Sequence, residues 1–440
     1  MYKIFVFIFL LFFFANGHAQ NMSNTAMVEQ NSTELYFDEN WSDLTKYGEK
    51  AIAKGYDYFF LRTRVGIAYY QQKKYKKAVR HFEKAVQFNS GDKLALEYLY
   101  YSYIFSGRES EARALVSLFP VRLKYLINPP KNKIIESVYC EGGVSSGNLY
   151  NIYANTDING PANIYGEATI TKSMQYLHFG LNHQLGNKLS VYHGYSNIKI
   201  DLTRRIGIYL KDTLDNYNLT QHDYYLSCIQ QFKHFAISPA VHFINVNFGK
   251  LNATKNLFTN KYVFTKKDTT FINYATSLSL IKNIGIYTYN LSAGFAQLNG
   301  LSQIQAGLAL TYYPFKNTNI YGTSSLVYLN ENYTNRIISI QKVGFKVMPK
   351  LWTEIGITYG NLQNYCENNA FVVFNTGDKI LYKCGISITS PLFKHFEFSM
   401  RYDYFNRENI YYRTNYLNKV ESLTINYKTQ TIIGGIKWKI

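Results

Sequence analysis

The carboxy-terminal part of the chain alternates apolar and polar residues with a period of two. Residues 395–405, HFEFSMRYDYF, are the clearest case, with aromatic and other apolar residues at the even positions. The odd positions hold His395, Glu397, Ser399, Arg401 and Asp403. Because successive strand residues point to opposite faces, the segment predicts a strand with one apolar and one ionic face. The apolar face could meet a protein core or lipid.

The same period recurs from residue 133 to 440. It predicts strands near 134–146, 173–185, 187–201, 220–232, 234–247, 270–281, 284–297, 301–313, 318–331, 333–346, 350–362, 378–390, 393–406 and 422–440. The links alternate between short turns and mostly long polar segments at 147–172, 202–219, 248–269, 363–377 and 407–421. Short turns on one rim and long loops on the other are typical of outer-membrane barrels. We therefore expect an antiparallel transmembrane β-barrel of about 14 strands, within a range of roughly 12–16.

The last strand breaks its own alternation. Leu423, Ile425 and Tyr427 are odd-numbered, whereas Trp438 and Ile440 are even-numbered. One extra residue in a strand shifts the phase of its side chains, so we predict a β-bulge near 428–432.

Residues 41–125 follow a helical period. In VGIAYYQQKKYKKAVRHFEKAVQFNSGD, small and aromatic residues recur at Gly66, Tyr69, Ala78, Phe82 and Ala85. This spacing resembles one tetratricopeptide repeat, and a weaker second repeat follows about 34 residues later. One further helix is expected before the first repeat, closed by a glycine and followed by an aspartate as the next N-cap. An array of about two and a half repeats is too short to be stable by itself, so we expect it to pack against another surface.

In such repeats the first helix lines a concave groove. Resemblance to the repeat assigns ten residues to this groove: Phe60, Thr63, Ile67, Tyr70, Gln71, Leu94, Glu97, Tyr101, Ile104 and Phe105. An apolar patch of this kind usually marks an interface, which predicts a periplasmic protein partner. The alternative is that the groove packs on the helix at 41–54 or on the barrel rim.

The amino terminus predicts the compartment. Lys3 precedes eleven apolar residues, 4–14, and small residues follow before Gln20. This is a secretory signal peptide, too short to span a bilayer. The predicted organisation is a signal peptide at 1–19, a linker at 20–40, a helical domain at 41–127, a linker at 128–132 and a barrel at 133–440. We expect the barrel in the outer membrane and the helical domain in the periplasm.

Composition agrees with a surface that alternates. Aromatic residues make up 17% of the chain, yet mean hydropathy is only −0.22. Of the net charge of +18, residues 131–440 hold 30 basic and 17 acidic side chains. Basic loop residues are expected to meet anionic outer-membrane lipids and lipopolysaccharide: Arg204, Arg205, Lys211, Lys255, Lys261, Lys266 and Lys267. A secreted barrel seldom meets nucleic acid, which we exclude as a partner.

Candidate chemistry is sparse. His193 and Ser196 are three residues apart and therefore face opposite sides of a strand, which argues against a Ser–His hydrolase. No phosphate-binding loop or ligand-spaced cluster is present, so we expect no catalytic residue, metal or cofactor. Cys384 is interpreted as lipid-facing, with a disulfide to Cys366 as the alternative.

Five charged residues are predicted to face the barrel lumen: Glu354, Lys383, Glu397, Arg401 and Asp403. They either form a selectivity constriction or pair with neighbouring strands to fill the interior.

The whole chain resembles the YaiO-like outer-membrane family, in which a signal peptide and a tetratricopeptide segment precede a barrel. The resemblance rests on this architecture, on YFFLRTRVGIAYY and on the apolar terminal strand IIGGIKWKI. Tetratricopeptide scaffolds joined to barrels also resemble polysaccharide secretion porins. The expectation is a non-enzymatic barrel with a docking module for export or assembly of a surface polymer. A lipid-modifying enzyme and a structural barrel without transport are the alternatives.

Overall fold

The structure is a computed structural model that describes residues 24–148, 163–208, 211–256, 258, 262–415, 417 and 419–440. The predicted signal peptide lies outside these residues. The chain divides into two compact units. The helical unit comprises the residues up to Pro130 together with the short segment Tyr313–Thr318, and the strand unit comprises Lys131–Tyr312 and Asn319–Ile440.

The helical unit is a stack of helix pairs with a period of 34 residues. It contains a helix at 24–37, α2 (Trp41–Ala53), α3 (Phe59–Gln71), α4 (Tyr75–Phe88), α5 (Lys93–Phe105), α6 (Glu109–Leu115), a short 3-10 turn (Val116–Leu118) and α7 (Val121–Ile127). Helices α2, α4 and α6 begin 34 residues apart, as do α3 and α5. The helix at 24–37 lies one period before α3. The array is therefore three helix pairs followed by α7, and not the predicted two and a half repeats.

The predicted linker at 20–40 is wrong over its described part, because residues 24–37 are helical. Val28 belongs to the hydrophobic core, and the Ser32 side chain is fully buried. Arg64 of α3 donates to Glu29 at 2.6 Å and to Ser32 at 3.2 Å. Val28 and Tyr36 join the core from this helix, and polar contacts add to theirs, which explains why its apolar periodicity is weak.

Close packing of α3 on α4 depends on a glycine. Leu61, Phe82 and Leu96 are all fully buried in the core of this unit. A Cβ atom at Gly66 would lie 2.8 Å from the Phe82 ring, closer than atoms can approach. The small residue at this repeat position is thus required for the two helices to meet.

The strand unit is a closed barrel of 14 antiparallel strands, as predicted. Its strands are β1 (Ser137–Gly147), β2 (Asn163–Leu185), β3 (Leu189–Ile208), β4 (Lys211–Gln231), β5 (Ala236–Lys255), β6 (Tyr262–Ile284), β7 (Tyr287–Leu298), β8 (Leu301–Tyr312), β9 (Ile320–Glu331), β10 (Thr334–Met348), β11 (Leu351–Tyr359), β14 (Lys379–Ser390), β15 (Phe396–Asn415) and β16 (Val420–Lys439). Each strand pairs with its neighbours in the chain, and β1 closes on β16. Two short strands, β12 (Cys366–Glu367) and β13 (Val372–Val373), form a separate hairpin.

One rim of the barrel carries short turns throughout, and we call it the short-turn rim. Strand β1 begins and β16 ends at this rim, where Ser137 pairs with Lys439. The opposite rim is uneven. Asn299 and Gly300, both with positive φ, make a tight turn between β7 and β8, a conformation in which asparagine and glycine are favoured.

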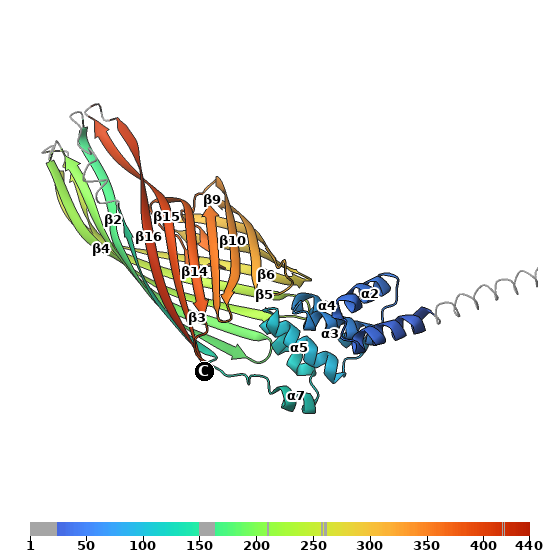
Figure 1. The fold of residues 1–440 in the computed structure, drawn as a ribbon. Helices are drawn as coiled ribbons and strands as arrows, with labels where there is room; N and C mark the ends of the chain where they lie inside the picture. Colours follow the sequence, from blue (N-terminus) through green and yellow to red (C-terminus); the bar gives the residue numbers. More distant parts are fainter. Residues whose placement is uncertain are drawn as a thin grey trace, which may run out of the picture. The chain divides into compact units, whose positions relative to one another are not determined.

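Parts of several segments predicted as loops are instead extensions of strands. Residues 202–208 and 211–219 continue β3 and β4, and 407–415 continues β15. The β5–β6 hairpin extends in the same way. Figure 1 shows the green strands and the red β15–β16 hairpin running beyond β9. Neither face of these extensions is uniformly apolar, so the alternation that predicts a lipid-facing strand is lost there.

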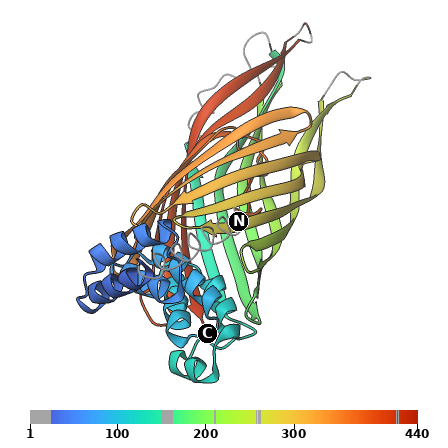
Figure 2. The same ribbon diagram turned by 90° about the vertical axis from the view of Figure 1, so that its right-hand side faces the viewer.

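The β15–β16 extension also pairs with β2, the strand on the other side of β1. Tyr412–Asn415 of β15 pairs with Asn163–Glu167 of β2, and the red hairpin lies beside this teal strand in Figure 2. Tyr411 and Tyr427 pack with Ala168 in a small hydrophobic cluster, joined by Leu423 and Ile425.

This packing removes the need for the predicted bulge in β16. The register of β16 with both neighbours is continuous from Thr429 to Trp438, so the bulge prediction is wrong. Odd-numbered residues face inward along the whole strand. Tyr427 faces inward because the side chains of the extension form a hydrophobic cluster of their own. Ile436 and Trp438, in contrast, face outward. The surroundings of the apolar residues therefore change along β16, whereas the alternation of its side chains is uninterrupted.

Candidate functional site

The outer wall of the barrel is apolar. Leu291, Leu308 and Leu326 face each other in register on β7, β8 and β9, with 51%, 51% and 58% of their surfaces exposed. Contiguous exposed apolar surface of this extent marks contact with lipid or protein. Aromatic pairs lie near the short-turn rim, including Tyr287 with Tyr312 and Phe396 with Trp438. An apolar band with aromatic residues at its edge is the surface of an outer-membrane-type barrel.

The lumen is occupied by the segment between β11 and β14. We call residues 360–378 the plug. Its residues 363–377 were predicted as an outer loop, but Tyr365, Glu367 and Ala370 are each no more than 3% exposed. Near its base, Leu362 and Phe374 pack with apolar residues of β9, β10, β14 and β15. An interior contact with distant strands cannot be read from local periodicity, which is why the sequence did not reveal the plug.

The plug leaves the wall at a glycine and turns at three residues of positive φ. Gly360 has φ 129°, and a Cβ there would lie 2.7 Å from the Ile337 carbonyl oxygen. At the tip, between β12 and β13, Asn368, Asn369 and Ala370 have φ of 52°, 56° and 63°. The left-handed region is unfavourable for alanine, so surrounding contacts must hold this tip in place.

Those contacts come from the far wall of the barrel. The Asn369 side-chain oxygen accepts from Ser277 at 2.7 Å and Ser279 at 3.1 Å. Its amide nitrogen donates to the Ser238 carbonyl and hydroxyl oxygens. The His242 Nδ1 lies 2.7 Å from the Ala370 carbonyl oxygen, to which it donates. The tip therefore bridges strands β5 and β6 across the lumen.

An aromatic contact secures the next residue. The Phe371 ring lies edge-on to three rings, at centroid distances of 5.3 Å to His178, 6.1 Å to Tyr192 and 5.0 Å to Tyr225. Edge-to-face pairs at these distances are favourable. Phe371 thus inserts between β2, β3 and β4.

All five predicted lumen charges make ion pairs. Lys383 pairs with Glu367 of the plug at 2.6 Å, and Glu354 pairs with Lys342 at 3.3 Å. The other three are on β15, where Arg401 pairs with Asp403 and Glu397 pairs with Lys439. Glu367 is the partner that sequence reasoning missed, because it was assigned to an outer loop.

Between the plug and the short-turn rim lies a polar cavity of about 390 Å³, which we call the vestibule. Many of its lining residues carry hydroxyl or amide side chains, among them Ser277, Ser279, Thr288, Asn290, Ser292, Thr311, Thr323 and Ser325. Its roof is plug residues 365–370. The lining also includes the Lys342–Glu354 ion pair and plug residue Glu367, and the plug lies across the lumen beyond the vestibule.

The structure separates His193 from Ser196 and gives Ser196 another histidine. Ser196 pairs in register with His178 on β2, and its Oγ lies 2.8 Å from His178 Nδ1. Tyr192 Oη lies 2.6 Å from the other ring nitrogen. Both members are buried in the lumen beneath Phe371. The pair joins two strands, so a search within one strand could not find it.

Cysteine and metal chemistry add little. Cys366 and Cys384 are free thiols. Among the described residues, no three or more His, Cys, Asp or Glu side chains gather in a way that could hold a metal. In that same part of the chain, no helix is long and apolar enough to cross a membrane.

The ten predicted groove residues of the helical unit divide into two groups. Thr63 and Ile67 are buried, and Ile67 is part of the core. The others are partly or fully exposed, with Phe60 at 59%. They include members of a connected aromatic cluster that consists of Tyr70, Tyr75, Tyr98, Tyr101 and Phe105. Sequence reasoning missed Tyr75 and Tyr98, which lie outside the repeat's groove positions. Burial raises the pKa of Tyr70 to about 12.

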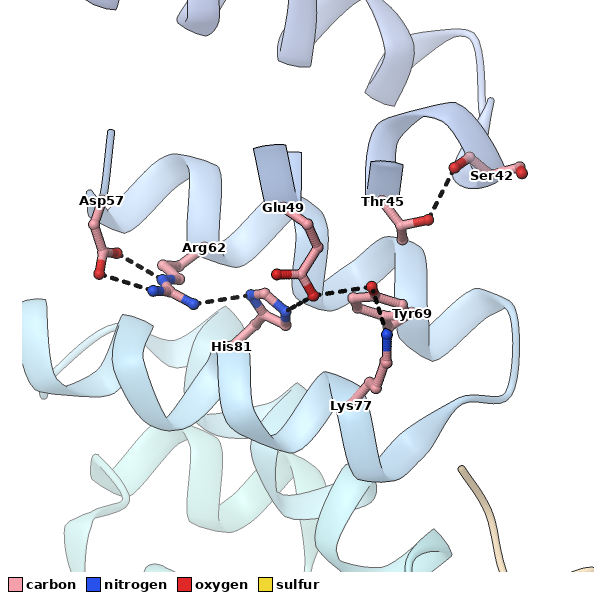
Figure 3. A network of polar contacts seen from close by, with 8 residues as sticks. All are labelled: Ser42, Thr45, Glu49, Asp57, Arg62, Tyr69, Lys77 and His81. Atoms are coloured by element: carbon pink, nitrogen blue, oxygen red, sulfur yellow. Dashed lines mark hydrogen bonds and ion pairs between the residues drawn. The ribbon is translucent and has the colours of Figure 1, made fainter. Parts of the chain in front are cut away.

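A polar network ties α2, α3 and α4 together (Figure 3). Asp57 accepts two hydrogen bonds from Arg62, at 2.6 and 2.8 Å, instead of capping α3 as predicted. Arg62 donates to His81 Nδ1, so His81 Nε2 carries the proton toward Glu49 at 3.3 Å. That hydrogen bond lowers the pKa of Glu49 to about 2, and burial lowers the pKa of His81.

Comparison with known proteins supports the helical unit directly. The tetratricopeptide repeat family model matches residues 61–92. No curated protein matches the chain by sequence.

Solved structures that resemble the chain are outer-membrane proteins. A FadL homologue of Pseudomonas aeruginosa is 8% identical, with a TM-score of 0.43, and the match covers 69% of this chain and 90% of that one. The toluene transporter TodX of Pseudomonas putida is 8% identical, with a TM-score of 0.43 and coverages of 72% and 92%. Omp33 of Acinetobacter baumannii is 8% identical, with a TM-score of 0.33 and coverages of 70% and 99%. Likenesses at this level carry no information on cargo.

Proposed function

We propose that this protein is a non-enzymatic outer-membrane barrel that provides a gated passage for hydrophilic material. The observation that carries the proposal is a closed barrel with an apolar exterior, a hydroxyl-lined vestibule and a lumen blocked by one segment. A blocked lumen lined by polar groups is useful for passage only if the segment moves. The short-turn rim faces the periplasm in barrels of this type.

The helical unit adds a docking role to this proposal. Tetratricopeptide repeats present surfaces for partners, and the aromatic cluster takes rings from α3 and α5, the helices that also carry exposed Phe60 and Leu94. We place this unit in the periplasm, where a partner protein would bind it. The pairing of a docking module with a barrel favours export or assembly of a surface polymer such as polysaccharide, and membership of the YaiO-like family belongs to the same proposal. Outer-membrane lipids and lipopolysaccharide are its expected lipid partners.

Conductance tests the gated passage. In planar bilayers, replacing residues 363–376 by a short Gly-Ser linker is expected to raise the conductance of the purified full chain. Glu367→Gln removes the plug's partner for Lys383 and is expected to increase opening events. Glu397→Gln is the matched control, since its ion pair with Lys439 joins two strands at the short-turn rim. If a folded, plug-deleted barrel conducts no ions, the proposed passage is refuted, and the alternative of a structural barrel without transport is favoured.

A double substitution tests the docking surface. Tyr70→Glu with Tyr101→Glu is expected to abolish capture of a periplasmic partner while heat-resistant migration of the barrel on gels persists. Phe88→Glu is the control, because Phe88 is 51% exposed on α4 outside the aromatic cluster. Loss of folding in the double variant would instead make the cluster an internal seam.

The Ser196–His178 pair is the observation that favours an enzyme. It faces the lumen and is covered by Phe371, so a lipid on the outer wall cannot reach it. Purified protein assayed on labelled phospholipid and lipid A should show no turnover. Turnover that disappears in Ser196→Ala would overturn the non-enzymatic proposal.

A further inference from the structure

His242 makes the contact that holds the strained tip of the plug. Its Nδ1 donates to the Ala370 carbonyl oxygen at 2.7 Å, and a carbonyl oxygen can only accept. The proton on Nδ1 is thereby fixed. In the neutral ring, Nε2 then carries a lone pair and no proton.

That lone pair faces a carboxylate. His242 Nε2 lies 3.7 Å from Asp223 Oδ2, and the side chains are 5% and 6% exposed. Within the described chain, neither His242 Nε2 nor Asp223 Oδ1 has a hydrogen-bond partner. Two buried acceptors that face each other without a shared proton are unfavourable. A proton on Nε2 would turn its contact with Asp223 Oδ2 into an ion pair.

The surroundings of His242 contain few other groups that titrate. The Tyr225 ring, on β4, lies edge-on to the His242 ring at a centroid distance of 5.5 Å. His178 of β2 interacts electrostatically with both His242 and Asp223. Glu141 of β1 lies beyond, near His178. Gln221 donates to Asp223 at 3.0 Å and is neutral. Asp223 is thus the anion in ion-pair range of His242.

We propose that His242 and Asp223 form a proton-dependent latch that holds the plug closed when His242 is protonated. This inference rests on the proposed gating role of the plug. In the protonated state His242 forms an ion pair with Asp223 through Nε2 and a hydrogen bond to Ala370 through Nδ1, and the positive charge strengthens both contacts. When the proton leaves, Nε2 and the carboxylate repel each other, and the tip is held less tightly. The latch therefore closes in acid and loosens as pH rises.

Hydrogen–deuterium exchange of the plug amides measures the latch without requiring conductance. After correction for intrinsic exchange, residues 363–376 of the wild-type chain should exchange faster at pH 8.5 than at pH 5.5. The expected difference is about fivefold, at the lower end of typical coupling effects. In His242→Asn, the amide nitrogen can replace Nδ1 as the donor to Ala370, and the pH dependence should disappear.

Two further variants separate the latch from general effects. Asp223→Asn removes the anion and should also flatten the pH dependence. His222→Asn should behave as wild type, because His222 is the residue before Asp223, faces outward and contacts Tyr195. Equal corrected exchange of the wild type at both pH values, or an unchanged pH dependence in His242→Asn, would overturn the latch. If exchange shows the latch but the plug-deleted barrel conducts no ions, the gated passage is refuted and the latch still stands.

Discussion

The helical unit and the barrel use the same apolar residue types with opposite outcomes. Leu61 in the helical unit is fully buried, whereas Leu291 on the barrel is 51% exposed. In the helical unit, apolar residues meet between helices, and polar residues face water. In the barrel, many apolar residues face outward, and the interior combines serines, threonines and charged pairs with apolar clusters around the plug. Hydrophobicity therefore indicates which face is apolar, and the architecture decides what that face touches.

The largest predicted effect follows from this contrast in the helical unit. Phe82→Ala removes a fully buried ring between α3 and α5 and is expected to lower the free energy of unfolding of that unit by about 3–5 kcal/mol. Limited proteolysis and thermal circular dichroism of the full chain measure this loss. The barrel should keep its heat-resistant migration on gels. Coupled loss of barrel folding would show that the two units do not fold independently.

The next largest effect tests the outward apolar face. Leu308→Arg places a charge in the middle of the apolar wall and is expected to destabilise the folded barrel by roughly 2–4 kcal/mol. Ala309→Ser is the control, because Ala309 lines the vestibule one residue away. Urea titration of the barrel in lipid vesicles gives both values. A tolerated arginine at position 308 would argue against lipid on this wall.

The smallest effect concerns pH and the network in Figure 3. The pKa of Glu49 is about 2 in the folded chain, below its usual value, and the pKa of His81 is also lowered. Both groups therefore bind protons more readily when unfolded. Their contribution to stability is complete above the unfolded pKa of His81, near 6.5, and declines as pH falls, with Glu49 adding to the loss below about 4.5.

Thermal unfolding of the helical unit in the full chain measures this dependence. The melting temperature should fall between pH 7.5 and pH 4, and Glu49→Gln with His81→Gln should flatten the curve. Glu39→Gln, on an exposed residue outside the network, should leave it unchanged. A wild-type curve that is flat in acid would contradict the role assigned to the network.

Local pattern was sufficient for most elements of the barrel. All fourteen predicted strands are present. They could be predicted because the two faces of a barrel strand differ in polarity, which makes the sequence alternate with a period of two. The helical repeats were also visible from Gly66 and Phe82, whose packing needs those residue types. The helix at 24–37 was missed because it lacks the repeat's apolar positions and relies on polar contacts such as Glu29 with Arg64.

The sequence by itself determined a repeat-containing helical segment and an alternating barrel. Only the tertiary structure decided which residues meet across the lumen: Glu367 with Lys383, His242 with the plug, and Ser196 with His178. It also decided that the apolar odd positions of β16 need no bulge. The physical reason is that periodicity encodes the orientation of a side chain relative to its own backbone. The identity of its partner depends on strand register, closure of the barrel and the path of a segment that has no period.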